Sequence, residues 1–369
     1  MSDAHKRDTA ALAPPSSFEE RWIEVRAWLD DRASYGPLGV LTALAAWLAI
    51  GIVGAPLALL AAPIWFWRRG KYLGAFGALI LLITVLGAAF APWIAPHSYE
   101  DVFLTESLRA PDATFPLGTD IAGRDQLSRI IYGAEVTVLV GFGTVIGIAI
   151  LSTLIGLISG YVGGTTDMLL QRFVDIWIGF PAIFLILSIL AIFGTGGDGF
   201  FGVGRGPDIG PQAGFDDRWL WQVFPRTTVV ILTLSVVIAG SASRVIRGSV
   251  LQVKNEQYVE AARALGASHG RIILSHILPN ILPTVIVLST LYLAVAILAE
   301  AAISFLGFGV VPPYPTWGQM LSGLARVLGP TNWWVAVFPG LAIFLAVYGI
   351  NMMGDAMRDL LDPRLRGSQ

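Results

Sequence analysis

Few side chains in this sequence could carry out metal or nucleophilic chemistry. Cysteine is absent, which excludes disulfides and thiolate metal sites. Of the four histidines, only His269 and His276 could share a helical face, and no carboxylate lies one turn from both. No G-x-S-x-G segment is present, which argues against a serine hydrolase of that type. We therefore expect no metal site and no catalytic residues, and we expect that the chain is not an enzyme.

A second possible chemistry is nucleotide binding through a phosphate loop. Such a loop needs the pattern G-x4-G-K-[ST], in which backbone amides and one lysine surround the phosphates. The only Gly-Lys pair is Gly70-Lys71, and a tyrosine follows it. The sequence thus predicts that this chain does not bind ATP by that route, so another chain must supply any ATP-derived energy.

Three charged residues lie in otherwise apolar runs. Glu300, in the run 284–308, has an alanine on either side. A carboxylate at that depth costs roughly 2.5–3.5 kcal/mol on insertion scales, so it must face protein or water. It is either a pathway or gate residue or a structural hydrogen-bonding group. Arg172 and Asp175 are three residues apart, and their spacing predicts a structural i,i+3 ion pair.

The most conspicuous polar stretch is the connector 257–280, which lies between two long apolar runs. In it, Tyr258, Ala262 and Leu265 recur at i, i+4 and i+7, which predicts a short amphipathic helix. Gly266 then supplies the left-handed residue with which many helices end.

A second short helix is predicted after this glycine. Ser268 can cap it, and it would run over 269–278 until Pro279 ends it. A helix, a glycine turn and a second helix could present alanine and leucine side chains to a groove on a partner protein. An ordinary connector at the membrane surface is the alternative, and the spacing alone leaves both open.

The elements that hold these residues are membrane spans. The chain is 55% hydrophobic and 14% charged, whereas soluble domains carry about 25% charged residues. The composition therefore predicts an all-α polytopic membrane protein. The net charge is −2 and the basic residues are scattered, so we expect no nucleic-acid binding.

Six core spans and one extra apolar segment account for the apolar runs. The extra segment, 37–71, is either one tilted span or a re-entrant hairpin, and it ends in a basic cluster that marks the cytoplasm. With that orientation, lysine and arginine are more frequent in the connectors on the cytoplasmic side, which include 257–280. The core spans are predicted near 72–94, 135–160, 169–193, 227–246, 284–308 and 334–353.

Two further polar regions are the N-terminal tail and a loop between two of these spans. The N-terminal tail 1–36 includes an amphipathic helix at 18–34, which would lie on the membrane interface or bind a partner. The glycine- and aromatic-rich loop 194–226 is either a contact surface or a solvated spacer.

The connector resembles the EAA loop of the membrane subunits of bacterial ATP-binding-cassette (ABC) importers. The resemblance rests on Glu260-Ala261-Ala262, Gly266 and Leu278-Pro279 at the spacing of that loop. His276 stands where isoleucine is usual. Together with Asn280 after Pro279, it resembles the dipeptide, oligopeptide and nickel branch of these importers.

Three further stretches, in the same order as in that branch, extend the resemblance over 72–366. One is an outer segment that contains the motif residues Gly118, Thr119, Asp120, Gly123, Arg124 and Asp125. The others are 299–318 and 354–364, around the fifth core span and at the C-terminal end. These motifs resemble the C-type member of the permease pair.

The resemblance implies a six-span type I importer permease core in the bacterial cytoplasmic membrane. It implies a second homologous permease subunit, two cytoplasmic ATPase subunits that bind ATP and Mg, and an extracytoplasmic substrate-binding protein. The loop 257–280 would couple the ATPases to the pore. Di- or oligopeptides are the expected cargo, and nickel or another small solute is the alternative. A secondary transporter is a weaker alternative, because it would leave the EAA loop without a role.

Overall fold

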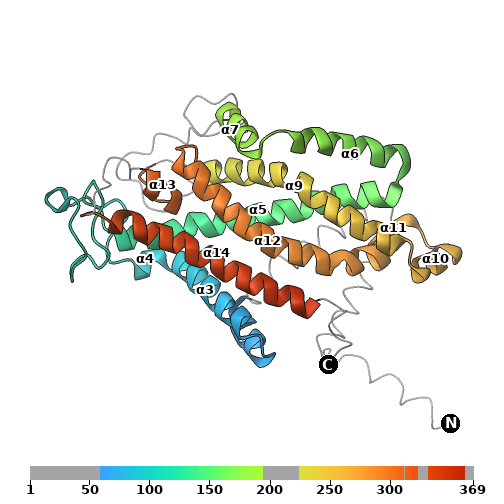
Figure 1. The fold of residues 1–369 in the computed structure, drawn as a ribbon, viewed down its shortest axis with the longest axis horizontal. Coiled ribbons are helices and arrows are strands. Elements are labelled where there is room, and N and C mark those ends of the chain that lie inside the picture. The colour runs from blue at the N-terminus through green and yellow to red at the C-terminus, as the bar shows by residue number, and fades with distance from the viewer. Residues whose placement is uncertain (1–58, 194–223, 311, 323–330, 362–369) are drawn as a thin grey trace, which may run out of the picture. The chain divides into compact units, whose positions relative to one another are not determined.

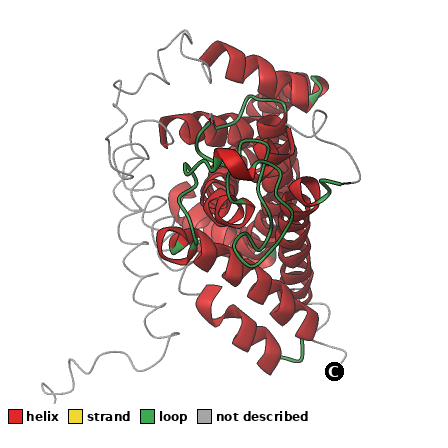
Figure 2. Ribbon diagram, turned by 90° about the vertical axis from the view of Figure 1, so that its left-hand side faces the viewer, coloured by secondary structure: helices red, strands yellow, loops and turns green. Residues whose placement is uncertain are grey.

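A computed structural model describes residues 59–193, 224–310, 312–322 and 331–361. The predicted tail 1–36, most of the segment 37–71, most of the loop 194–226 and the last residues of the C-terminal motif lie outside this part of the chain. The regular structure of the described residues is helical (Figure 2). In the loop before α5, an isolated β-bridge joins Thr119 to Asp125.

The helices are labelled as in Figure 1 and follow one another along the chain. Residues 59–68 are helical, and the named elements are α3 (Tyr72–Ala89), α4 (Ala91–Ile94), η1 (Leu104–Glu106), α5 (Gln126–Val162), α6 (Gly164–Gly179), α7 (Ala182–Phe193), α9 (Phe224–Lys254), α10 (Gln257–Ala264), α11 (His269–Arg271), η3 (Ile272–Ile277), α12 (Leu278–Phe305), α13 (Trp317–Ser322) and α14 (Trp334–Leu361).

The chain divides into two compact units. The first comprises 1–55 and 250–282, of which 250–282 is described, and it contains the polar connector. The second comprises 56–249 and 283–369 and contains most of the apolar helices. Each unit is described by itself below.

Five described helices are long and apolar enough to cross a membrane, namely α3, α5, α9, the continuous helix from His269 to Phe305, and α14. A sixth crossing exists if α6 and α7 together form one span. The helices extend beyond several of the predicted spans. For example, α5 has 37 residues, which corresponds to about 55 Å at 1.5 Å per residue.

The predicted span 169–193 is not one straight helix. α6 and α7 meet at an angle of 90° across the break between Gly179 and Ala182. Phe180 takes extended backbone angles, φ −81° and ψ 137°, because the ring of a following proline disfavours helical geometry in the residue before it. Pro181 also has no amide hydrogen with which to continue the helix.

Small residues allow close packing between α3 and α14, which lie side by side in the second unit (Figure 1). A Cβ added to Gly74 would lie 2.3 Å from the Cβ of Ala356, and one added to Gly77 would lie 2.3 Å from the carbonyl oxygen of Gly349. Such contacts hold helices together in lipid, where no hydrophobic driving force separates protein from solvent. An ion pair of 2.8 Å between Lys71 and Asp359 joins these two segments.

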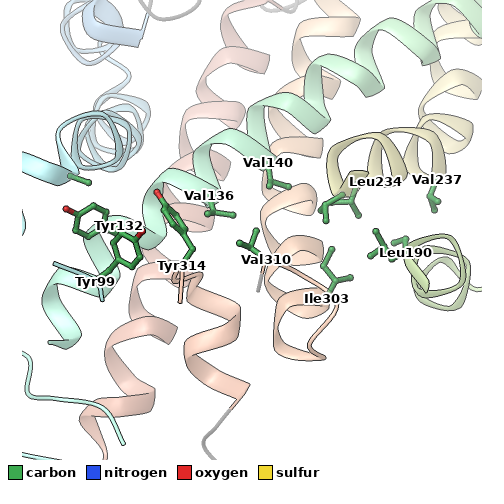
Figure 3. Close-up of a cluster of buried hydrophobic side chains, with 13 residues drawn as sticks. Tyr99, Tyr132, Val136, Val140, Leu190, Leu234, Val237, Ile303, Val310 and Tyr314 are labelled. Atoms are coloured by element: carbon green, nitrogen blue, oxygen red, sulfur yellow. The ribbon is translucent and has the colours of Figure 1, made fainter. Parts of the chain in front are cut away.

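One buried cluster joins α5, α7, α9 and α12 to the loops that follow α4 and α12 (Figure 3). At one end of the cluster, the ring of Tyr99 lies 4.9 Å from the rings of both Tyr132 and Tyr314. At the other end, Leu190 of α7 and Leu234 of α9 are fully buried. This core anchors the loop after α12 to the long helix α5.

Candidate functional site

The polar connector begins with α10, whose buried side chain is Val259. α10 packs against η3 in the same unit. Glu260 lies in its first turn and Arg263 in its last turn, and both charges are favourable for the helix dipole at these ends. Apart from Val259, the side chains of this short helix are exposed or half-buried, so they are available for contact with another molecule.

Gly266 ends α10 in a left-handed turn, with φ +83°. Its amide donates to the carbonyl of Arg263 at 3.0 Å, and the amide of Ala267 donates to the carbonyl of Ala262 at 3.1 Å. These two bonds form a Schellman motif, as the sequence predicted for a glycine at this position. A Cβ at position 266 would meet none of the described atoms within 4 Å. The glycine is therefore needed for its backbone conformation and not for space.

The second helix begins as predicted but does not end at Pro279. The Ser268 side chain accepts a hydrogen bond from the amide of Arg271. The chain then continues through α11 and the π-helix η3 into α12, so Pro279 lies inside a continuous helix. The amide of Leu278 bonds the carbonyl five residues earlier, that of Ile273. The prediction of a break was wrong, because Pro279 directly follows a π-helical turn, in which the regular i→i−4 hydrogen-bond ladder is already interrupted.

The His276 and Asn280 positions that characterise the branch contact each other locally. The Asn280 side chain donates a hydrogen bond of 2.6 Å to the carbonyl oxygen of His276. The His276 ring lies 6.4 Å from the ring of Tyr258, so it faces α10. Partial burial raises the pKa of the Tyr258 hydroxyl, and the negative charge of Glu256 adds a smaller effect in the same direction. These contacts support the connector from within.

Leu265 is the most exposed large apolar side chain of the connector, at 89%. Tyr258, Glu260 and Ala261 are also exposed, whereas Ala262 is half-buried. The side chain of Glu260 forms no hydrogen bond or ion pair with the described residues. A protruding leucine beside small alanines and one carboxylate can enter a groove on a partner protein. Nothing in this arrangement supports acid–base chemistry.

The outer segment, which we define as residues 97–125, is held together by its motif residues. The Thr119 hydroxyl donates to the carbonyl of Glu106 and accepts the amide of Arg109 at 2.9 Å. The carbonyl of Thr119 accepts a 3.2 Å hydrogen bond from the indole of Trp334. Thr119 is fully buried, so its role is to tie the segment to α14.

The two aspartates of the motif organise the turn before α5. Asp120 accepts hydrogen bonds from the amides of Ala122 and Arg124 at 2.8 and 3.0 Å, and from the Arg124 side chain at 2.8 Å. Asp125 is the N-cap of α5 and accepts the amide of Ser128 at 3.2 Å. The ring of His97 lies 3.2 Å from the same carboxylate. Both aspartates are therefore buried and paired.

The motif glycines are needed for conformation and for space. Gly118 has φ +75° and Gly123 has φ +76°. A Cβ at Gly123 would lie 2.2 Å from the carbonyl oxygen of Phe103, and one at Gly118 would lie 2.8 Å from the Trp334 ring. No other residue fits either position without a local rearrangement.

The exposed part of the outer segment consists of other residues. Leu104 is 82% exposed, and Val102 and Ile121 are also exposed. Near them, the amide of Phe115 donates to Asp112 and lowers the pKa of that carboxyl, an effect to which the amide of Thr114 adds. The motif thus shapes the segment, and any partner of this segment would meet these exposed apolar side chains.

Glu300 is buried in α12, at 2% exposure. The Ser304 hydroxyl donates to its Oε1 at 2.6 Å, one helical turn later. Its Oε2 forms no hydrogen bond with the described residues. The structure thus places Glu300 in the protein interior, and it shows a local hydrogen bond.

A second carboxylate inside a membrane helix, Glu135, was missed by the sequence reasoning. It lies within α5 and accepts a hydrogen bond from the hydroxyl of Tyr314. The available signal was an acidic residue at the first position of the predicted span 135–160. It was overlooked because that span was taken to begin there, whereas the helix begins at Gln126.

The predicted pair between Arg172 and Asp175 does not form. Asp175 instead accepts a hydrogen bond from Arg244 of α9, which is 69 residues away. A second pair joins the same two helices: Arg247 donates two hydrogen bonds to Asp167 at 2.7 and 2.5 Å. The predicted pair fails because α6 lies beside α9, so both aspartates of α6 meet arginines of α9.

These features define a class: a multi-pass helical membrane protein whose polar helix–turn–helix connector presents an apolar contact point. The profile of the family "Binding-protein-dependent transport system inner membrane component" matches residues 152–367. The profile "N-terminal TM domain of oligopeptide transport permease C" matches residues 66–111. The chain belongs to the binding-protein-dependent inner membrane component family, and it is a permease subunit of an ABC importer in the cytoplasmic membrane.

Three curated relatives agree with this membership. The dipeptide transport system permease protein DppC of Alkalihalophilus pseudofirmus is 37% identical over 79% of this chain and 85% of its own length. The di/tripeptide transport system permease protein DppC of Pseudomonas aeruginosa is 36% identical over 82% and 92%. The glutathione transport system permease protein GsiD of Escherichia coli is 35% identical over 82% and 90%.

Proposed function

We propose that this chain forms part of the translocation pore of an importer for short peptides. The observation that carries this proposal is the similarity to permease subunits whose names specify dipeptides, di/tripeptides and glutathione, over about four fifths of this chain. Glutathione is itself a short peptide, so the three names share one substrate class. Nickel, the other cargo expected from the sequence, is not favoured by these relatives.

We propose further that the connector 257–280 is the coupling loop of the pore. Leu265 and its alanine neighbours would occupy a groove on an ATPase subunit, with Glu260 at its edge. Tyr258, His276, Pro279 and Asn280 would support the loop from within. Movement of the ATPases would then move α10 as a rigid element and switch the pore between two states. The exposure of Leu265 and the Schellman turn at Gly266 support this role.

The partners follow from this mechanism. The absence of a phosphate loop from the sequence suggests that ATP and Mg bind to separate cytoplasmic subunits, two per importer. A second, homologous permease subunit would complete the pore. An extracytoplasmic binding protein would deliver the peptide to the outer segment, where Leu104 and Ile121 are exposed.

Co-purification and transport test the proposal. The tagged chain, expressed with its genomic neighbours, should bring down a second permease and nucleotide-hydrolysing subunits. Proteoliposomes that contain this complex and its binding protein should take up radiolabelled dialanine in the presence of ATP, and should not do so without ATP. Recovery of the chain without any ATPase, or uptake that follows an ion gradient and ignores ATP, would contradict the proposal.

A further inference from the structure

A half-exposed ion pair lies on two apolar helices of the second unit, at Arg244 of α9 and Asp175 of α6. The side chains are 45% and 50% exposed. Both helices belong to candidate membrane spans, α9 by itself and α6 as half of the bent pair. Charged side chains in membrane spans face water or protein and not lipid, because their burial in hydrocarbon is unfavourable. Arg244 lies near the cytoplasmic end of the predicted span 227–246, so this face meets water or another protein at that end of the helices.

The neighbouring pair between Arg247 and Asp167 is a useful comparison, because it joins the same helices. It has two hydrogen bonds, and the Ser159 hydroxyl also donates to Asp167. Its side chains are only 31% and 18% exposed. Asp167 therefore accepts three hydrogen bonds, and this pair has a structural role. In contrast, Arg244 and Asp175 share one hydrogen bond, so the remaining guanidinium N–H groups and the second carboxylate oxygen form no hydrogen bond with the described residues.

The surface of α9 around Arg244 is mixed, because Ser241 and Gly248 lie beside it together with the apolar Val245. Ser241, Arg244, Val245 and Gly248 are all exposed and recur at i, i+3, i+4 and i+7, so they form one stripe along the helix. The Ser241 hydroxyl lies 3.3 Å from the hydroxyl of Tyr292 on α12.

This stripe differs from the exposed stripe of α3, which faces away from the core with Phe76, Leu79, Ile83 and Leu86. An apolar stripe of that kind suits lipid. In the α9 stripe, a Cβ added at Gly248 would meet none of the described atoms within 4 Å, so no described residue covers this part of α9.

We propose that Arg244 binds the carboxylate of a peptide as it passes through the translocation pathway, and that Asp175 holds the guanidinium in position. The inference rests on the proposed peptide-import function. Every peptide has a terminal carboxylate whatever its side chains, and the planar guanidinium is the side chain best suited to a carboxylate. A half-exposed site gives only modest affinity, as a pathway needs if its cargo is to leave again.

Cysteine labelling tests whether this face lines a water-filled path. The chain contains no cysteine, so Ser241→Cys introduces its only thiol. Ser241 is exposed on the same stripe and lies inside the predicted span 227–246, whereas Gly248 lies beyond the end of that span. In the assembled importer in membrane vesicles, with the reagent on both sides of the membrane, a charged, membrane-impermeant methanethiosulfonate should label Ser241→Cys and should leave Ile83→Cys on α3 unlabelled. Labelling of Ser241→Cys no greater than that of Ile83→Cys would overturn the proposal, because lipid or the second permease would then cover this face.

Transport tests the role of Arg244 directly. Arg244→Gln should lower dialanine uptake per ATP hydrolysed by about tenfold or more, the loss expected for one charge-assisted hydrogen bond. Arg244→Lys should restore part of it, since a charged donor remains. Arg172→Gln removes an exposed arginine of α6 that lies one turn from Asp175, and it should behave as the wild type. A merely structural role would lower assembly and leave uptake per ATP unchanged.

The two proposals fail in different ways. If the wild-type importer takes up dialanine and Arg244→Gln keeps the wild-type ratio of uptake to hydrolysis, the Arg244 inference is wrong and the peptide function stands. If Ser241→Cys is labelled but the wild type takes up no peptide, the peptide function is refuted, and with it the peptide carboxylate as the ligand.

Discussion

Substitution of Gly266 tests whether the left-handed turn after α10 is needed for coupling. With φ +83° and no described atom within 4 Å of an added Cβ, the backbone conformation alone opposes a side chain here. For an L-residue, the left-handed conformation costs about 1–2 kcal/mol. This corresponds to a factor of about 5–30 in the ratio of the native turn to its alternatives, which is the largest loss of the native turn that the strain can cause. Asparagine tolerates this conformation far better than valine does.

We therefore expect Gly266→Val to lower binding-protein-stimulated ATP hydrolysis and dialanine uptake by about 5- to 30-fold, and Gly266→Asn to remain near the wild type. The assay uses the assembled importer in proteoliposomes, with the amount of inserted chain measured by immunoblot. Gly70→Val is a matched control, because Gly70 also has a positive φ, +72°, and open space around it but lies outside the connector. It should share the local strain and retain the coupling of ATP hydrolysis to uptake.

Two results would refute this reasoning. Wild-type uptake by a well-inserted Gly266→Val variant would show that the Schellman turn is not needed for coupling. Equal losses in Gly266→Asn and Gly266→Val would show that the side chain itself obstructs a partner, whatever the backbone conformation.

Three further predictions concern the connector and the outer segment. Leu265→Asp should weaken co-purification of the ATPase subunits by roughly 10- to 100-fold, since burial of a leucine contributes about 1.5–3 kcal/mol. Leu265→Met should leave co-purification nearly unchanged. Equal recovery with both variants would argue against docking through Leu265. Gly123→Ala should lower the thermal stability of the purified chain more than Gly70→Ala does, because it adds a contact of 2.2 Å with Phe103 to the same backbone strain; equal midpoints in a melting experiment would contradict this. Asp125→Ala should destabilise the chain by about 0.5–2 kcal/mol through loss of the α5 N-cap. Asp125→Asn should be closer to the wild type in stability. Equal melting midpoints for the wild type and both variants would count against the N-cap.

The family profiles cover the connector and the motifs that follow it, whereas the outer-segment motif at 118–125 lies between the two matched ranges. The resemblance was stated for 72–366, and the two family profiles match 66–111 and 152–367. The motif residues themselves divide into two groups in the structure. Those of the connector include exposed side chains, such as Leu265 and Glu260. Those of the outer segment, such as Thr119 and Asp125, are buried, so a shared pattern there records a folding requirement.

The sequence by itself determined the features that depend on local chemistry. Runs of apolar residues predicted the membrane helices. In lipid there is no water to pair with backbone polar groups, and an α-helix satisfies them within one segment. Gly266 predicted a left-handed helix end, and Ser268 predicted a cap, since each acts on backbone groups within five residues. The EAA spacing predicted the family for the same reason: it is a pattern within one short segment.

Only the tertiary structure decided which distant groups meet. Asp175 pairs with Arg244 and not with its neighbour Arg172, because α6 lies along α9. Glu135 accepts a hydrogen bond from the hydroxyl of Tyr314, which is 179 residues away. The sequence analysis predicted one span over 169–193, whereas the structure has two helices that meet at 90° on either side of Pro181. Spacing along a chain specifies neighbours within a few turns, whereas packing selects the partners of polar groups in an apolar interior, where each unpaired group is costly.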